Sequence, residues 1–181
     1  EDAVILEQTD YLEILQDDLP IFRFEDNSPP YKLITFKRVK MKILTLKGLD
    51  KYANFEFTKK FKDNIIAFDG RVLKPDHREF LIQASDVVEV NTRNFGYGFI
   101  SDQSYDIKLK IAFPNVEVGD MIEYVYSYES TNFSPYNLSG EILLNTEIPV
   151  LKSDYHVKVP RDMDITYILY NNFQKHEVSA D

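Results

Sequence analysis

Residues 105–128, YDIKLKIAFPNVEVGDMIEYVYSY, carry the clearest structural signal in the chain. Apolar and polar side chains alternate before a turn-forming segment at 114–120, and the alternation resumes after it. A period of two places one face of a strand on a core and the other in solvent, which no helix could do with the same residues. We therefore predict one β-hairpin here, with Asp106, Lys108, Lys110 and Glu123 facing outward.

Short extended segments separated by turn-forming residues fill the rest of the chain, and no stretch of ten or more residues has a helical period. The other expected strands are 3–7, 11–15, 21–24, 33–46, 52–61, 65–68, 71–73, 80–90, 141–145, 151–159, 165–170 and 174–178. Residues 48–50 and 69–70 are among the expected breaks. The pattern predicts an all-β fold, a large two-sheet antiparallel β-sandwich, formed as a single domain over residues 1–181.

Composition excludes several classes of function. The 181 residues carry a formal net charge of -9, which opposes binding to a phosphate backbone, so nucleic acid is not an expected partner. No apolar run approaches the roughly 20 residues that a membrane helix needs, and we expect no direct membrane insertion. The chain has no cysteine, which rules out a disulfide, a thiolate zinc site or a cysteine nucleophile within it. The lack of tryptophan disfavours a carbohydrate-binding module.

No pattern of catalytic or metal-binding residues stands out. His77, His156 and His176 are far apart in sequence and have no ligand spacing. The run DHRE at 76–79 resembles a catalytic cluster, but it follows a proline in an expected turn, where solvated side chains are the commoner explanation. Loop serines lack a G-x-S-x-G motif, and nothing orients the acidic pairs toward one cleft. We predict no catalytic, metal-binding or cofactor-binding residue and no cofactor.

Two aromatic loops are candidates for a contact surface that binds a protein, peptide or glycan. They lie at 94–99 and 132–136, and their large side chains are Phe95, Tyr97, Phe99, Phe133 and Tyr136. Strand alternation does not guarantee burial in such loops. The alternative, which we favour, is that these side chains fold back and cap the open ends of the sandwich.

A row of three cations offers a second candidate surface. Arg38, Lys40 and Lys42 alternate with apolar residues in the expected strand at 33–46, so all three share one face. They could hold an anionic ligand. We favour the alternative that they form a solvated strand face that also protects against aggregation.

Several segments together are similar to a known family. They are RVKMKILTLKGL at 38–49, DGRV at 69–72, FPNVEVGDMIEY at 113–124, Pro149 and the Val159-Pro160 pair. In this order they resemble an uncharacterised bacterial domain of unknown function that lies N-terminal to transglutaminase-like domains in exported proteins of Gram-negative bacteria. F-P-x-V-x-x-G-D-x-I-E-Y is the most specific of the motifs. The sequence departs from the family at 75–77, where a glycine-bearing turn is expected.

The resemblance implies a two-sheet β-sandwich that assists a papain-like Cys, His and Asp domain acting on peptide or amide bonds. This chain has no cysteine, so that nucleophile would belong to a downstream domain of the same polypeptide. The family has no established catalytic residues in this domain, and none is carried over. The start at Glu1 and the expected hairpin before Asp181 suggest part of a longer, exported protein, periplasmic by the resemblance.

Three functions follow for testing. The first is a non-catalytic module that positions, shields or recruits substrate for a transglutaminase-like or protease-like domain. The second is a free-standing glycan- or peptide-binding module that uses the aromatic loops. The third, an independent enzyme based on carboxylates or histidines, is disfavoured by the residue patterns.

Overall fold

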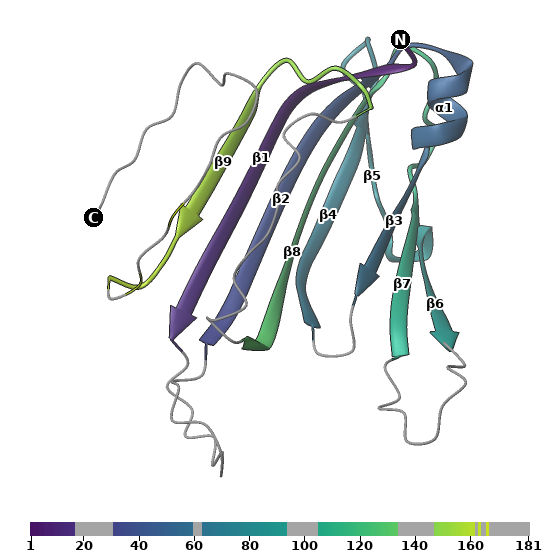
Figure 1. Cartoon of the computed structure of the whole chain (residues 1–181). Coiled ribbons are helices and arrows are strands. Elements are labelled where there is room, and N and C mark those ends of the chain that lie inside the picture. The colour runs from purple at the N-terminus through teal and green to yellow at the C-terminus, as the bar shows by residue number, and fades with distance from the viewer. Residues whose placement is uncertain are drawn as a thin grey trace.

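The computed structural model describes residues 1–16, 31–59, 63–93, 105–133, 147–161, 163 and 166. In these residues the chain forms two β-sheets, one α-helix and one 3-10 helix (Figure 1). The six-stranded sheet has the order β5 (Glu79–Leu81), β4 (Asp63–Leu73), β8 (Met121–Phe133), β2 (Tyr31–Ile43), β1 (Ala3–Gln16) and β9 (Ser153–Lys158). The three-stranded sheet has the order β3 (Asn54–Lys59), β7 (Tyr105–Ala112) and β6 (Val87–Arg93). The predicted all-β, two-sheet fold is confirmed.

Neighbouring strands are antiparallel with one exception at the edge of the larger sheet. There β1 pairs in parallel with β9, and the parallel pairing extends to a bridge between Ile5 and Val150. The amide N–H of Ile5 donates to the carbonyl of Pro149 at 2.8 Å, and that of Leu151 donates to the carbonyl of Ile5 at 2.9 Å. Residues 149–151 are therefore held along the start of β1.

The two strands of residues 105–128 do not form the predicted hairpin. Strand β7 pairs with β3 and β6 in the small sheet, whereas β8 pairs with β2 and β4 in the large one. The connection thus crosses from one sheet to the other. Alternation had correctly identified two strands with one buried face each, but that pattern is the same whether the strands pair edge to edge or face each other across a core. The eight-residue connection, 113–120, is also longer than most hairpin loops, which have about 2–5 residues.

The core lies between the two inner faces. Its buried members come from the large sheet and from the crossing segment: Ala3, Ile5, Val39, Met41, Ile43, Val72, Phe113 and Ile122. From the small sheet, the partly buried Phe55 packs against them. Beyond them, aromatic rings interleave across the sheets. The ring centroid of Tyr124 lies 4.7 Å from that of Phe55, and the Phe57 centroid lies 5.0 Å from Tyr126 and 5.5 Å from Tyr128. Such tilted aromatic pairs stabilise sheet packing beyond the area that they bury.

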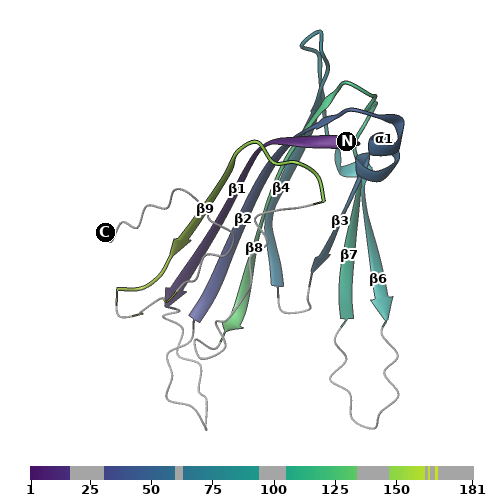
Figure 2. The same ribbon diagram turned by 45° about the horizontal axis from the view of Figure 1, so that its top comes forward.

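A short helix, α1 (Leu46–Tyr52), replaces the predicted end of one strand, the break at 48–50 and the start of the next strand. Thr45 caps it by accepting a hydrogen bond on its side-chain oxygen from the Gly48 N–H at 3.0 Å. The amides of Leu44 and Thr45 both donate to the carbonyl of Asp2 at 3.1 and 3.2 Å. Figure 2 shows α1 beside the N-terminus at one end of the molecule. These contacts with the start of the chain override the weak helix propensity of Gly48.

Other predicted boundaries were wrong where a polar run, such as residues 8–10, or a glycine resembled a break. The segments at 3–7 and 11–15 form one strand, β1, with a bulge between Ile5 and Glu7. Strand β4 continues through Gly70, whereas the predicted strand at 80–90 is divided between β5, the 3-10 helix Ala84–Asp86 and β6. The strands predicted at 21–24, 141–145, 165–170 and 174–178 lie outside the described residues, apart from Thr166.

Candidate functional site

The row of cations on β2 lies on the outer face of the large sheet, as predicted, and Arg38 is part of an ion-pair network there. Glu123 on β8 is 7% exposed and accepts hydrogen bonds from both Arg38 and Arg71. The Arg38 Nε is 3.0 Å from Glu123 Oε1, and the Arg71 Nη2 is 2.6 Å from Oε2. Burial alone would raise the pKa of Glu123, but the two guanidiniums outweigh it and lower that pKa. The outward direction predicted for Glu123 is correct, and one of the three cations is already neutralised within the protein.

The crossing segment at 114–120 is built around a buried lysine. Lys74, 7% exposed, donates from Nζ to Asp120 Oδ2 at 2.7 Å, to Glu117 Oε2 at 2.9 Å and to the Asn115 carbonyl at 2.6 Å. The Glu117 N–H also donates to Asp120 Oδ2 at 2.7 Å. Burial would lower the pKa of Lys74, but the hydrogen bonds to Asp120 and Glu117 raise it. All three donors of the ammonium are used, so this cluster has a structural role and leaves no group free for a ligand.

Two further contacts attach the crossing segment to β2. The Gly119 N–H donates to the Ile43 carbonyl at 2.9 Å, and the Ile43 N–H donates to the Asp120 carbonyl at 3.0 Å. Gly119 has φ +98°, a conformation that side chains disfavour, which explains why glycine precedes the aspartate of the motif. The glycine and aspartate of the most specific family motif therefore have a structural role: they let the chain reverse direction as it crosses from one sheet to the other.

The DHRE run at 76–79 forms the tip and end of the β4–β5 turn. His77 has φ +69°, so it occupies the left-handed position for which the family led us to expect glycine. Asp76 and Arg78 are exposed and interact with each other, with Arg78 Nε 2.7 Å from Asp76 Oδ2. Its geometry is that of a solvated turn.

The other predicted surfaces are only partly described. Phe95, Tyr97, Phe99 and Tyr136 lie outside the described residues, and of Phe133 only the backbone, at the end of β8, is described. The contact surface made by these aromatic residues stays a prediction. His176 also lies outside the described residues, and within them no group of three or more His, Asp or Glu side chains could hold a metal ion.

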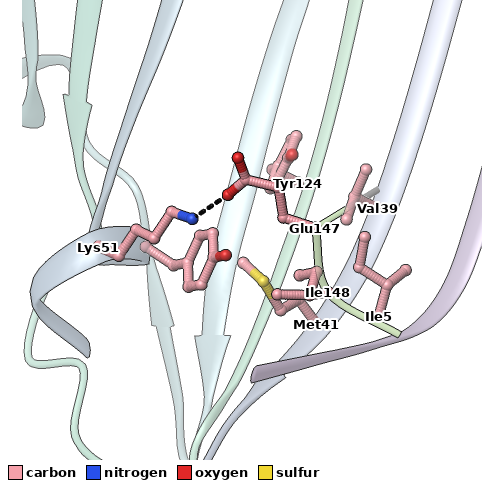
Figure 3. A pocket seen from close by; sticks show the side chains of 8 residues that line it. Ile5, Val39, Met41, Lys51, Tyr124, Glu147 and Ile148 are labelled. Atoms are coloured by element: carbon pink, nitrogen blue, oxygen red, sulfur yellow. Dashed lines mark hydrogen bonds and ion pairs between the residues drawn. The ribbon is translucent and has the colours of Figure 1, made fainter. Parts of the chain in front are cut away.

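A pocket of about 250 Å³ lies where α1 meets the inner face of the large sheet (Figure 3). Three strands of that sheet, the helix and the segment before β9 line it, with the residues Ile5, Val39, Met41, Lys51, Tyr52, Tyr124, Glu147 and Ile148. The strand residues are apolar apart from the tyrosine hydroxyl. This hollow is open to solvent on one side, and we take it as the candidate site.

An ion pair between Lys51 and Glu147 marks the solvent side of the pocket (Figure 3). The side chains of Lys51 and Glu147 are 47% and 83% exposed. Their hydrogen bond raises the pKa of Lys51 and lowers that of Glu147, so both stay charged. The Lys51 ammonium also lies 5.2 Å from the ring centroid of Tyr52, a cation–π distance.

Polar groups continue from the pocket along the inner face. Gln8 pairs with Val39 in the register of β1 and β2, and its amide donates to Asp10 Oδ2 at 2.6 Å. Asp10 Oδ1 lies 3.1 Å from the Lys37 ammonium. Burial, the neighbouring Tyr128 and the charge of Asp10 raise the pKa of Tyr126 to about 12, so its hydroxyl remains protonated. The apolar pocket therefore borders a polar stretch of the sheet that includes the Asp10–Lys37 ion pair.

Sequence reasoning did not find this pocket. Lys51 and Glu147 are 96 residues apart, and each lies in a connection between two expected strands. The one sequence signal for a helix at Lys51 is Thr45, because threonine is a preferred N-cap residue. Nothing in the sequence pointed to Glu147, because its position depends on the parallel pairing of the following residues with β1.

No helix in the described part of the chain is long and apolar enough to cross a membrane.

Comparisons with known proteins agree with the fold and identify the family. No curated protein matches the chain. One similar solved structure, from Parabacteroides distasonis, is described as a "putative protease"; the two superpose with a TM-score of 0.66 at 14% sequence identity. The match covers 88% of this chain and 29% of that protein, so the likeness shows the fold of a part. The family described as "Domain of Unknown Function with solved-structure structure (DUF3857)" matches residues 30–181, and the chain belongs to this family.

Proposed function

We propose that this chain is a non-catalytic module that presents substrate to a domain acting on peptide or amide bonds in the same polypeptide. One observation carries the proposal: the fold matches 29% of a longer protein that is described as a protease of unproven activity. The remaining part of such a protein leaves room for a separate catalytic domain. The family resemblance indicates a transglutaminase-like partner domain, and with it export to the periplasm, which cell fractionation tests.

The side-chain chemistry of the chain supports a presenting role. A papain-like partner would need a thiol nucleophile, and these 181 residues contain no cysteine. The best-buried charged groups, Lys74 with Asp120 and Glu123 with its two arginines, are paired within the protein and stabilise the sheets. An open pocket with polar groups at its rim is suited to binding.

The test compares the longest natural polypeptide with a form that lacks residues 1–181. Turnover is measured on a protein substrate and on a small amide. We expect the truncated form to have a higher KM for the protein substrate and an unchanged kcat for the small amide, because only presentation is lost. Equal KM values, turnover by residues 1–181 alone, or a coding sequence without Cys and His after Asp181 would each refute the proposal.

A further inference from the structure

We propose that the pocket between α1 and the large sheet binds one apolar side chain of a peptide, while Lys51 and Glu147 bind the peptide backbone beside it. The inference rests on the proposed function and names the substrate class for the same module. It assigns a site on the inner face of the sandwich, lined by other residues than the aromatic ones singled out in the sequence.

The size and lining of the pocket suit a single side chain. Ile5, Val39, Met41 and Ile148 supply apolar walls, and the ring of Tyr124 closes one side (Figure 3). An apolar cavity of about 150 Å³ holds a benzene molecule, so the volume of about 250 Å³ here accommodates the side chain of leucine or phenylalanine. Burial of that side chain would supply the main part of the binding free energy.

The ion pair of Lys51 and Glu147, which forms the rim of the pocket, suits an amide group. Lys51 has three ammonium hydrogens and uses them on Glu147 Oε2 and on the Tyr52 side chain, which leaves one, and Glu147 keeps a second carboxylate oxygen. The rim therefore offers an N–H donor and an oxygen acceptor side by side. A peptide unit needs both, because its C=O accepts and its N–H donates.

The same rim disfavours two other classes of ligand. A fatty acid would bring its carboxylate next to both Lys51 and Glu147, where repulsion by the Glu147 carboxylate offsets attraction to the ammonium. A sugar ring would need a free aromatic face for stacking, but the Lys51 ammonium already lies over the Tyr52 ring, 5.2 Å from its centroid. A blocked peptide carries no net charge and needs no free ring face.

The backbone that carries Lys51 and Glu147 is also held in place before any ligand binds. Backbone hydrogen bonds between Ile5 and residues 149–151 hold the segment that carries Glu147, and helix α1 carries Lys51. The backbone entropy of these two segments is therefore already lost during folding, which favours binding.

The three methionines allow a direct test by NMR of methyl-labelled protein. Met41 lines the pocket, whereas Met121 and Met163 do not. N-acetyl-leucine amide and N-acetyl-phenylalanine amide should shift the Met41 methyl signal saturably, with a Kd of about 1 mM for ligands of this size. N-acetyl-glycine amide, which has no side chain, should leave it in place.

Two variants and a matched control separate recognition from folding. Lys51→Met and Glu147→Gln should each raise the Kd about fivefold, the effect of losing one hydrogen bond. Lys110 is about as exposed as Lys51, and Lys110→Met breaks its ion pair with Glu56 on the small sheet; this change should leave the Kd within about twofold. Thermal unfolding of each variant verifies that the fold is intact.

Several outcomes would overturn the peptide assignment: no saturable shift of Met41, an equal shift with the glycine amide, or preferential binding of decanoate. These results leave the accessory function separately testable. If Met41 does not respond while the KM of the longer polypeptide still depends on residues 1–181, the pocket assignment is wrong and the module presents substrate elsewhere. If Met41 responds and KM does not change, the pocket binds peptides without serving catalysis.

Discussion

The buried pair of Lys74 and Asp120 should be the most sensitive point of the fold, because it holds the segment that crosses between the sheets. Lys74→Met keeps the volume of the side chain and removes its charge. Asp120→Asn keeps an oxygen that can accept the hydrogen bond from the Glu117 N–H. Each change leaves the other charged group buried without its main partner, since the two residues are 7% and 2% exposed.

The expected magnitudes follow from the environment of each charge. Lys74→Met should lower the free energy of unfolding by about 3 kcal/mol, the usual cost of a buried charge whose partner is removed. Asp120→Asn should cost about 2 kcal/mol, because Lys74 keeps Glu117 and the Asn115 carbonyl as acceptors. The double variant should lose about 3 kcal/mol, because it leaves no buried charge without a partner. This loss is about 2 kcal/mol smaller than the sum of the two single losses, and that difference is the coupling energy of the pair.

Urea unfolding followed by far-ultraviolet circular dichroism measures these values, since the chain has no tryptophan for fluorescence. Lys110→Met, which breaks the exposed pair with Glu56, serves as the control and should not move the midpoint measurably. If the two single changes add within about 0.5 kcal/mol in the double variant, the argument for a coupled buried pair is refuted.

Three further predictions concern packing and pH. Gly48→Ala should destabilise the protein by about 2 kcal/mol in urea unfolding, because the new Cβ would lie 1.9 Å from the Asp2 carbonyl oxygen; an unchanged midpoint would contradict this close approach. The pKa of Glu123 is lowered from 4.5 in the folded state, so its stabilisation is present above pH 4.5 and lost as the pH falls below that value. Glu123→Gln should therefore flatten the acid side of a stability–pH profile, and parallel profiles would disprove the assignment. The pKa of Tyr126 is raised to about 12 in the folded state, so its contribution to stability is present below pH 10 and is lost as the pH rises from 10 toward 12. Tyrosinate absorbance should therefore rise together with unfolding in an alkaline titration. Ionisation of all tyrosines near pH 10 while the protein stays folded would contradict this prediction.

Much of the large sheet was predictable because its strands bury one face each. Alternation in 33–43 and 122–128 placed Val39, Met41 and Ile122 on the core face and Arg38 outside, and the structure agrees. The helix α1 was missed because it is only seven residues long and contains Gly48. Its stability comes from the contacts of residues 44 and 45 with Asp2, which local propensity does not reveal.

The candidate site was less predictable than the fold. The residues singled out for binding were aromatic side chains in loops, whereas the pocket uses β1, β2, β8, α1 and the segment before β9. Its two charged rim residues meet across 96 positions of sequence. No local pattern could have paired them, because many exposed lysines and glutamates in the chain have the same surroundings in sequence.

The sequence by itself determined the all-β class, the inner and outer face of the central strands and the family motif, because side-chain alternation and turn chemistry are local properties. The tertiary structure decided which strands pair. The 105–128 segment has the alternation of a hairpin, yet Lys74 and the backbone of Ile43 hold its middle so that β7 and β8 join different sheets. Those contacts join residues about 40 or more positions apart in the chain, and only the folded protein brings them together.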